Sequence, residues 1–528
     1  MKNKQQIWLP FFLGITMSIG IFLGFIMRDK FPDKGFFSTK QPTTLDEVMY
    51  LVDQHYVDKI DLGSIADTII QSVINKLDPH SEYLSYQELN SLNEQLEGRF
   101  SGIGIEFDMI HDTLYVTYVI PDGPAAKGGL KSGDKIISVD NKKVSGIRLP
   151  TDSIKSLIKG DAGSVVEISC LRNNSPFKTT IKRGNIELSS VDAAYMVNAQ
   201  TGYIRLNKFA NNTYKEFMKA LMELKARNMK NLILDLRDNG GGILDQAIEI
   251  ADEFLSDDKL ITYTEGNHSP RKNYTCKRQG QFESGQVVVL CNEGSASASE
   301  VLMGALQDWD RATIVGQTSF GKGLVQEVFE LRDKSALKLT IARYYTPTGR
   351  CIQRSYNKGE DAYYSEVANR KSSASHIAVA DSLKKAGKIY ITPKGKKLFG
   401  GGGITPDQLT ATDTTMYSDF LYNILGENVI TQYALLYVQQ HSRDLEKKSN
   451  AIEFSRKFIT DNETWKQFLS FVSAQGYETA SLRPTEKPAI EKSIKAAIGR
   501  QIWGKDGFFK IINAEDKDIS TAIKALSQ

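Results

Sequence analysis

The sequence has few of the residues on which metal, disulfide and nucleic-acid chemistry depend. Its 528 residues include four cysteines, which form neither a C-x-x-C pair nor a metal-site spacing, so a disulfide can be neither assigned nor excluded. There is no H-E-x-x-H motif and no Gly-Lys-Ser/Thr phosphate loop. The net charge is only +3, with no long basic run. We therefore expect no metal, no cofactor and no nucleic-acid partner.

Only one apolar run is long enough to cross a membrane. Residues 7–27 form 21 consecutive uncharged residues, which as a helix would measure about 31 Å. A cleaved signal peptide is the alternative, but its apolar core is usually about 7–15 residues long and is followed by a small-x-small cleavage site. Residues 27–30 (Met-Arg-Asp-Lys) offer no such site. We expect an uncleaved transmembrane anchor, whose orientation the flanking basic residues leave open.

The stretch from residue 287 to residue 326 predicts a serine at a turn between a strand and a helix. Val287–Cys291 is short, apolar and β-branched, as in a buried strand. Residues 295–300, Ser-Ala-Ser-Ala-Ser-Glu, then open a segment with helical spacing. Ser297 lies on this turn, and Lys322 follows 25 residues later between two glycines, before a further predicted strand.

A serine at such a turn can be a nucleophile if a base lies close to it. The first N–H groups of the helix have no intrahelical acceptor and can stabilise an oxyanion. Lys322 can act as the base only when its amine is neutral, which requires burial to lower its pKa. Ser297 and Glu300 also fit an ordinary capping box, in which the serine only caps the helix. The spacing alone favours neither interpretation.

Three longer motifs resemble those of the C-terminal processing peptidases, or tail-specific proteases, of peptidase family S41 in clan SK. They are residues 294–300 (GSASASE), 316–323 (GQTSFGKG) and 343–350 (RYYTPTGR). The resemblance implies a Ser-Lys dyad, with Ser297 as nucleophile and Lys322 as general base. It also implies that Gln326 orients the lysine, and the even spacing would put both on one face of a strand.

The resemblance extends to a glycine loop. Residues 232–237 read as a buried strand that ends in Asp-Asn-Gly-Gly-Gly, similar to the family's "LDLR.NPGG" segment. This similarity implies an oxyanion hole built from the N–H groups of Gly241 and Ala298. Gly240 stands where proline is common in the family, so the loop could differ in mobility.

A second resemblance, to PDZ domains, begins at residue 102. Glycines there would let backbone N–H groups converge on a peptide carboxylate, with isoleucines lining the pocket beside a helix at 153–158. Taken alone, residues 102–105 also fit a glycine-rich hairpin bend, which is the alternative interpretation. The peptide-binding residues we expect are Gly102, Ile103, Gly104, Ile105 and Leu157.

His80 is the competing candidate for the base. It lies in the segment 77–84, which is similar to the family's "LDPHS.Y". A histidine at such a turn is more often a structural residue with its hydrogen bonds satisfied than a catalytic one.

We predict an α+β multidomain chain with an α/β protease core of the ClpP/crotonase-like type. The predicted parts are a transmembrane anchor (1–30), a linker and helical region (31–95), a PDZ domain (96–184), a serine protease core (185–415) and a helical C-terminal extension (416–528). The extension is either a module for homo-oligomerisation or adaptor docking, or a packing appendage. Residues 355–398 form a polar insertion of unassigned role.

The function expected is that of a serine endopeptidase. The resemblance implies extracytoplasmic substrates with accessible, apolar C-termini, and places the catalytic part on the periplasmic side of a bacterial inner membrane, held there by a single-pass helix. The alternative is a catalytically silent PDZ scaffold or chaperone, against which the intact Ser297, Lys322 and Gln326 speak.

Overall fold

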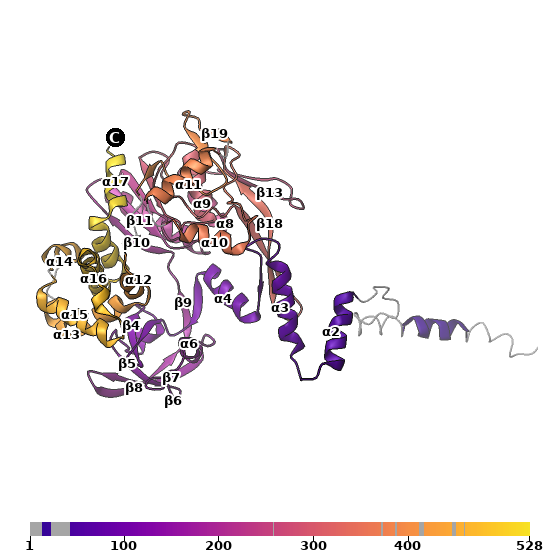
Figure 1. The fold of residues 1–528 in the computed structure, drawn as a ribbon, viewed down its shortest axis with the longest axis horizontal. Coiled ribbons are helices and arrows are strands. Elements are labelled where there is room, and N and C mark those ends of the chain that lie inside the picture. The colour runs from indigo at the N-terminus through magenta and orange to yellow at the C-terminus, as the bar shows by residue number, and fades with distance from the viewer. Residues whose placement is uncertain are drawn as a thin grey trace, which may run out of the picture. The chain divides into compact units, whose positions relative to one another are not determined.

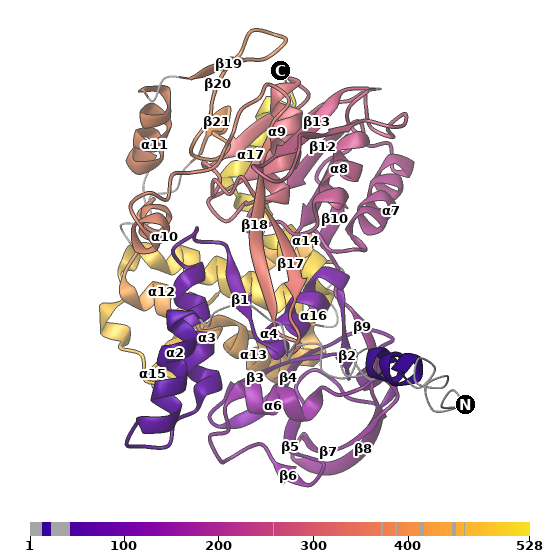
Figure 2. The same cartoon turned by 90° about the vertical axis from the view of Figure 1, so that its right-hand side faces the viewer.

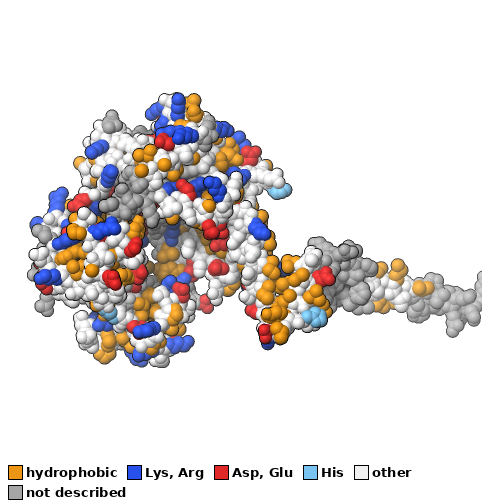
Figure 3. Space-filling view, viewed as in Figure 1, with side chains coloured by type: hydrophobic (Ala, Val, Ile, Leu, Met, Phe, Trp, Pro, Cys, Tyr) orange, Lys and Arg blue, Asp and Glu red, His pale blue; other side chains and the backbone are white. Residues whose placement is uncertain are grey.

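The computed structural model describes residues 13–22 and 43–527, except for 257, 371–372, 386–387, 411–416, 446–449 and 459. Contacts divide the chain into two units, Met1–Ser72 and Val73–Gln528. In the first, α2 (Thr44–His55) starts at a capping box formed by Thr43 and Asp46. Its residues Leu45, Val48 and Leu51 are about half exposed (49%, 48% and 47%), and apolar side chains gather on this segment (Figure 3). α3 (Leu62–Ile74) follows.

The predicted transmembrane helix is wrong. No helix in the described part of the chain is both long and apolar enough to cross a membrane. Of the expected span, residues 13–22 form a helix, and ten helical residues measure about 15 Å, half of a bilayer core. Residues 7–12 and 23–27 of that span lie outside the described residues.

The PDZ-like part is an antiparallel sheet of order β3-β4-β5-β7-β8, with β6 paired to β5. Its core includes Leu114, Val116, Ile136 and Ile168, each fully buried. Strand β2 (Arg99–Gly102) follows α4 (Tyr86–Glu97), and β9 (Gly184–Glu187) comes after β8. These two short strands pair with each other and so join the beginning and the end of the domain. The other elements are β3 (Ile105–Ile110), β4 (Thr113–Val119), α5 (Pro124–Lys127), β5 (Lys135–Val139), β6 (Lys142–Lys143), α6 (Thr151–Ile158), β7 (Val165–Arg172) and β8 (Ser175–Lys182).

The protease core is built on a sheet of order β10-β11-β12-β15-β16-β21, parallel except for the β10–β11 pair. Figure 1 labels β10 and β11 of this sheet. The central strands of the sheet are apolar on both faces, as in parallel sheets covered by helices. The strands are β10 (Val191–Met196), β11 (Thr201–Leu206), β12 (Asn231–Asp235), β15 (Val287–Cys291), β16 (Thr313–Gly316) and β21 (Gln408–Leu409), and the helices are α7 (Thr213–Ala226), α8 (Leu244–Asp252) and α9 (Ala298–Asp308).

Alternate residues of the central strands serve two different cores. Val287 and Val289 pack with α7, α8 and α9, whereas Val288 and Leu290 point to the opposite face. There they meet the C-terminal helix α17 (Lys517–Ala525), through Ile519 and its neighbours. The period of two in a strand explains this division, so the last helix of the chain is part of the protease core.

A second sheet, β1-β18-β13-β14 with β17 paired to β18, carries the lysine segment (Figure 2). β17 and β18 form a long hairpin, and β1 pairs with β18. This pairing brings the segment around residue 80 next to the hairpin. The strands are β1 (Glu82–Leu84), β13 (Leu260–Glu265), β14 (Lys272–Thr275), β17 (Leu324–Glu330) and β18 (Ala336–Tyr345).

The insertion forms α10 (Glu360–Ala368), α11 (Ser373–Lys385), β19 (Ile389–Ile391) and β20 (Lys397–Phe399). The C-terminal region is helical, as predicted, and has its own core around Phe454, Phe468 and Ile494. Its helices are α12 (Asp419–Gly426), α13 (Val429–Leu445), α14 (Ala451–Lys457), α15 (Asn462–Ala474), α16 (Lys487–Ile512) and α17.

Because Ile519 is only 3% exposed against the sheet, Ile519→Ala should lower the free energy of unfolding by about 2–4 kcal/mol. Ser520→Ala, on the exposed side of the same helix, should change it by less than about 0.5 kcal/mol. Chemical denaturation followed by near-UV circular dichroism measures both. Equal stability of the two variants would show that α17 is not part of the core.

Candidate functional site

Ser297 lies at the sharp turn between β15 and α9. It is the N-cap of α9 and has φ 56° and ψ −116°, a backbone conformation that costs a non-glycine residue about 1–3 kcal/mol. All eleven residues of α9 behind it are buried. The turn therefore holds the serine in a strained position at the carboxyl end of a central strand, where active sites of open α/β sheets usually form.

Lys322 lies in the loop that precedes β17 and is half-buried. The pKa of its amine is lowered to about 8: burial is the main cause, the positive charge of Lys338 is the second, and the carboxylates of Glu300, Glu82 and Asp78 oppose the shift. At pH 7 about a tenth of such amines are neutral, compared with about one in two to three thousand for an unperturbed lysine. The loop thus gives the lysine the property that a general base needs.

Glu300 joins these two segments. Its side chain is fully buried, and Oε2 accepts hydrogen bonds from the backbone N–H of Ser297 (2.9 Å) and of Lys322 (2.8 Å). Oε1 accepts from the hydroxyl of Ser319 (2.5 Å) and the N–H of Gly321 (2.8 Å). Burial raises the pKa of Glu300 and these four donors oppose the rise. The Glu300 carboxylate is thus the acceptor that the serine turn and the lysine loop share.

Tyr344 of β18 makes a second bridge between the same residues. Its hydroxyl hydrogen-bonds to the backbone carbonyl of Ser297 (3.1 Å) and to that of Lys322. The ring is 2% exposed. Two buried side chains, one acting on the N–H groups and one on the carbonyls, therefore hold the backbone of Ser297 close to that of Lys322.

The predicted oxyanion residues lie beside Ser297. A Cβ placed on Gly241, which has φ +96°, would come within 2.8 Å of Ser297 Cβ and 2.9 Å of Ala298 N, so only glycine fits there. The Gly241 N–H, however, donates to Asn239 Oδ1 (2.9 Å) in this conformation. Ala298 is the first residue of α9, where N–H groups have no intrahelical acceptor. Ala298 is thus the better placed of the two predicted donors.

Gln326 does not have the geometry that its spacing suggested. Lys322 precedes β17, and a bulge between Val325 and Gln326 shifts the register with β18. The Gln326 amide instead donates to Thr340 Oγ1 (3.3 Å), which bonds to Asp78 Oδ1 (3.1 Å). The argument that an even spacing aligns Lys322 with Gln326 on one face of a strand therefore fails. Gln326 lies in β17, the strand that follows the lysine loop.

His80 is a structural residue in this arrangement. Its Nε2 pairs with the hydroxyl of Tyr363 (2.9 Å). Burial lowers its pKa to about 3, with a further contribution from the charge of Lys322. A group with that pKa is a weak base, which favours the structural interpretation.

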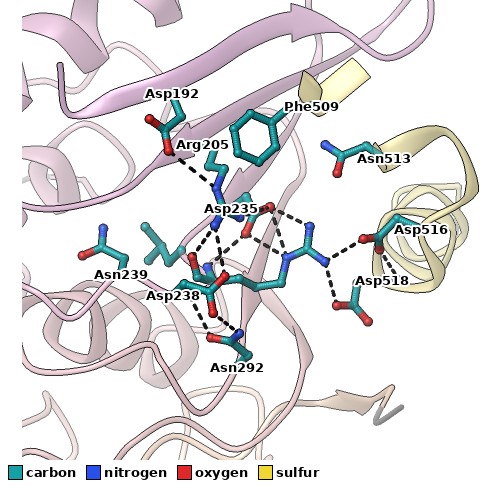
Figure 4. Close-up of polar contacts among 12 residues, drawn as sticks. Asp192, Arg205, Asp235, Asp238, Asn239, Asn292, Phe509, Asn513, Asp516 and Asp518 are labelled. Carbon is teal, nitrogen blue, oxygen red and sulfur yellow. Dashed lines mark hydrogen bonds and ion pairs between the residues drawn. The ribbon is translucent and has the colours of Figure 1, made fainter. Parts of the chain in front are cut away.

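The strand under the glycine loop ends in a buried ion network (Figure 4). Asp235 accepts from Nε (3.0 Å) and Nη2 (2.7 Å) of Arg237 and from Nη1 of Arg205 (3.0 Å). Burial alone would raise the pKa of Asp235, but the two arginines outweigh it and hold it well below its usual range. Arg237 also bonds Asp516 and Asp518 (2.9 Å each). The start of α17 is thus tied to the loop that contains Gly241.

The PDZ-like part has a groove of about 270 Å³ between its glycine segment and α6. Gly102, Ile103, Gly104 and Ile105 line it, and α6 contributes Thr151, Lys155 and Ile158. Leu157 packs against the domain core instead. The prediction chose the wrong face of α6 by one residue, a rotation of about 100°.

The C-terminal region contacts both the PDZ-like part and the protease core through α16. Arg500 forms an ion pair of 2.6 Å with Glu106, which lines the groove. Six residues later, the carboxylate of Asp506 accepts from the N–H of Ala194 in β10 (3.2 Å). Gly504, which lies between these two contacts, has non-helical backbone angles (φ 66°, ψ −161°). The segment α16 therefore links the groove wall to the sheet that precedes Ser297 across a break in the helix.

Among the described residues, no three His, Cys, Asp or Glu side chains are grouped to hold a metal ion. All four cysteines are free, and burial raises the pKa of Cys291 well above its ordinary value.

Sequence reasoning missed the roles of Tyr344, Asn239, Asp235 and Arg237, and gave Glu300 only that of a cap. All five stood inside motifs quoted for the resemblance. The clearest signal was that Glu300, three residues after the candidate nucleophile, is the one charged residue in the apolar run 298–306.

Comparison with known proteins gives three matches to family profiles. Residues 200–359 match "Peptidase family S41", residues 101–182 match "PDZ domain", and residues 420–504 match a family of unknown function, DUF8443.

Two curated relatives illustrate the similarity. The chain is 35% identical over 320 residues to a carboxy-terminal-processing protease of Bartonella bacilliformis, covering 60% of this chain and 73% of that protein. It is 34% identical over 303 residues to a probable CtpA-like serine protease of Staphylococcus haemolyticus, covering 57% and 60%. A solved photosystem II D1 C-terminal processing protease is 30% identical, with 57% and 87% covered and a TM-score of 0.32.

Glu300→Gln should disable this site, because an amide can accept on one side only. Its NH₂ group would face the N–H groups of Ser297 and Lys322 in one orientation and the N–H of Gly321 in the other. Each unsatisfied buried donor costs about 1–3 kcal/mol, so we expect kcat/KM for a fluorogenic peptide to fall at least about 100-fold. Glu327→Gln, on exposed β17, is the control and should stay within about twofold. Unchanged turnover of Glu300→Gln would contradict the bridging role.

Proposed function

The chain belongs to peptidase family S41 and is a serine peptidase of the carboxy-terminal-processing kind with a PDZ domain; on this premise we propose that it cleaves proteins with a Ser297–Lys322 dyad and selects them by their C-termini. The observation that carries the dyad is the buried Glu300 carboxylate, which accepts from the N–H of both residues.

In the proposed reaction, neutral Lys322 removes the proton from the Ser297 hydroxyl, whose oxygen attacks the substrate carbonyl carbon. The Ala298 N–H stabilises the oxyanion, and the Gly241 N–H joins it once it leaves Asn239. Lys322 then gives its proton to the leaving amine as the C–N bond breaks, which leaves an acyl-enzyme. Water attacks this ester with Lys322 again as the base, and Ser297 is restored.

Selection of substrates would take place in the PDZ groove. The glycines at 102 and 104 leave backbone N–H groups near an apolar pocket lined by Ile103 and Ile105, a combination suited to a free carboxylate that follows an apolar side chain. Lys155 and Lys159 on the groove wall are paired with Asp152 (3.1 Å) and Glu94 (2.6 Å), so the backbone N–H groups are the donors proposed for the terminus. The ion pair of Arg500 with Glu106 gives the occupied groove a physical connection to the core.

We further propose extracytoplasmic substrates, an inference that rests on the resemblance to C-terminal processing peptidases alone. Fractionation of cells against cytoplasmic and periplasmic marker enzymes measures it. Recovery with the cytoplasmic marker would contradict it.

The pH dependence tests the base. Because Lys322 must lose its proton and its pKa is lowered to about 8, kcat/KM should rise about tenfold per pH unit below pH 8 and level off above it. Lys338→Met removes the second cause of that low pKa, so the midpoint of the profile should move to higher pH. Lys322→Arg, which stays protonated, should lose at least about a thousandfold in activity.

The matched control for the base is His80→Ala, which should keep the midpoint near pH 8. If the midpoint of the pH profile moved in His80→Ala but not in Lys338→Met, a group other than Lys322 would be the base. Appreciable activity in Lys322→Arg would lead to the same conclusion. A wild type that binds peptides but hydrolyses none would support the silent-scaffold alternative.

Tail selection is tested with one substrate protein in three forms. The form with a free apolar C-terminus should be cleaved about ten times faster than the amidated form or the form ending in Asp, because both lose contacts in the groove. Ile105→Lys should abolish this preference while Ser297 still reacts with a small active-site probe. Equal cleavage of free and amidated tails by the wild type would show that the PDZ domain does not read the terminus.

A further inference from the structure

A second cavity, of about 500 Å³, lies between α10, α11 and the glycine segment 401–402. The residues proposed for catalysis do not line it. Its charged lining residues among those described are Arg354, Lys358, Glu366 and Arg370. Three cations thus face one carboxylate, an imbalance that favours a bound anion.

Arg354 is the residue that identifies the cavity as a binding site. It is 7% exposed, its Nη1 donates to the carbonyl of Tyr363 (2.7 Å), and the same nitrogen bonds to the Glu366 carboxylate. Its Nε and Nη2 are buried and have no hydrogen-bond partner among the described residues. Buried donors without acceptors are rare and costly, so they call for a ligand or another explanation.

The two free nitrogens form one edge of the guanidinium, the edge that grips a carboxylate with two parallel hydrogen bonds. Arg237 shows this edge filled, since its Nε and Nη2 hold Asp235. The faces of the Arg354 guanidinium are occupied, because it stacks 4.8 Å from the ring centre of Phe320 and 4.0 Å from that of Tyr363. Only the edge is left for a ligand.

The other charges do not fill this edge. The one carboxylate of the cavity, on Glu366, is shared with Arg370, whose Nε (3.0 Å) and Nη2 (2.9 Å) both bind it. Arg370 Nη1 donates to the carbonyl of Ser319 (2.8 Å) and is also engaged. Lys358 is exposed at the cavity lining and can supply a second positive charge.

We propose that this cavity binds an oxyanion with two acceptor oxygens, a carboxylate or a phosphate, on the Nε–Nη2 edge of Arg354. The site is separate from the PDZ groove and from the proposed dyad. It lies next to the lysine loop, because the Arg354 N–H donates to the carbonyl of Gly321 (3.0 Å). A bound anion would therefore be held two hydrogen bonds away from Lys322.

Isothermal titration calorimetry of the full chain tests the proposal, with sodium phosphate and sodium acetate as probes against a chloride background of constant ionic strength. We expect one anion per chain. Arg354→Lys keeps the charge but loses the planar edge, so affinity should fall about tenfold. Ala362→Trp fills the cavity from the exposed side of α10 and should abolish binding.

Lys219→Ala removes an exposed cation of α7 and should leave the affinity within about twofold. Tighter binding of phosphate than of acetate identifies a phosphate site, and the reverse identifies a carboxylate site. No binding to the wild type at 10 mM, on the order of the weakest specific affinities, overturns the proposal. Unchanged binding in Ala362→Trp also overturns the proposal. This substitution is on the surface, so the proposal can be tested even if Arg354→Lys fails to fold.

Discussion

The buried carboxylate of Glu300 is the constraint on which the catalytic site depends. The serine belongs to a parallel sheet and the lysine to a separate, antiparallel one, so nothing in either sheet alone fixes the distance between them. One oxygen that accepts from both amides fixes it. Removing this carboxylate from water is costly, and four donors compensate for it. The hydroxyl of Tyr344 then closes the same junction from the carbonyl side.

Much of the fold follows from local pattern. The β-branched run at 287–291 and the capping signal at 297–300 specify a strand, a turn and a helix, and the structure has all three. Patterns of this kind are read along the chain and need no knowledge of distant residues. The same holds for the glycine segment that begins the PDZ groove and for the helical C-terminal region.

What could not be predicted depends on contacts between distant segments or on single-residue rotations. Arg237 and Asp516 are 279 residues apart, and no local pattern connects them. The bulge before Gln326 shifts the strand by one residue, which reverses the face on which a side chain lies. Leu157 and Ile158 on α6 also differ by one residue, which is a rotation of about 100° around the helix. The transmembrane helix predicted at residues 7–27 is a different case, because the run of apolar residues does not by itself set the length of a helix, and the described helix covers residues 13–22.

The strained turn at Ser297 has a consequence for how such an enzyme tolerates change. A conformation that costs about 1–3 kcal/mol is a sizeable part of a net stability of about 5–15 kcal/mol. The turn persists because β15 and α9 are buried along their whole length and leave the serine no room to relax. Substitutions that loosen this packing would let the turn relax well before the domain unfolds. Such substitutions would cost activity before they cost the fold, so the packing of α9 serves the geometry of the turn as much as the stability of the domain.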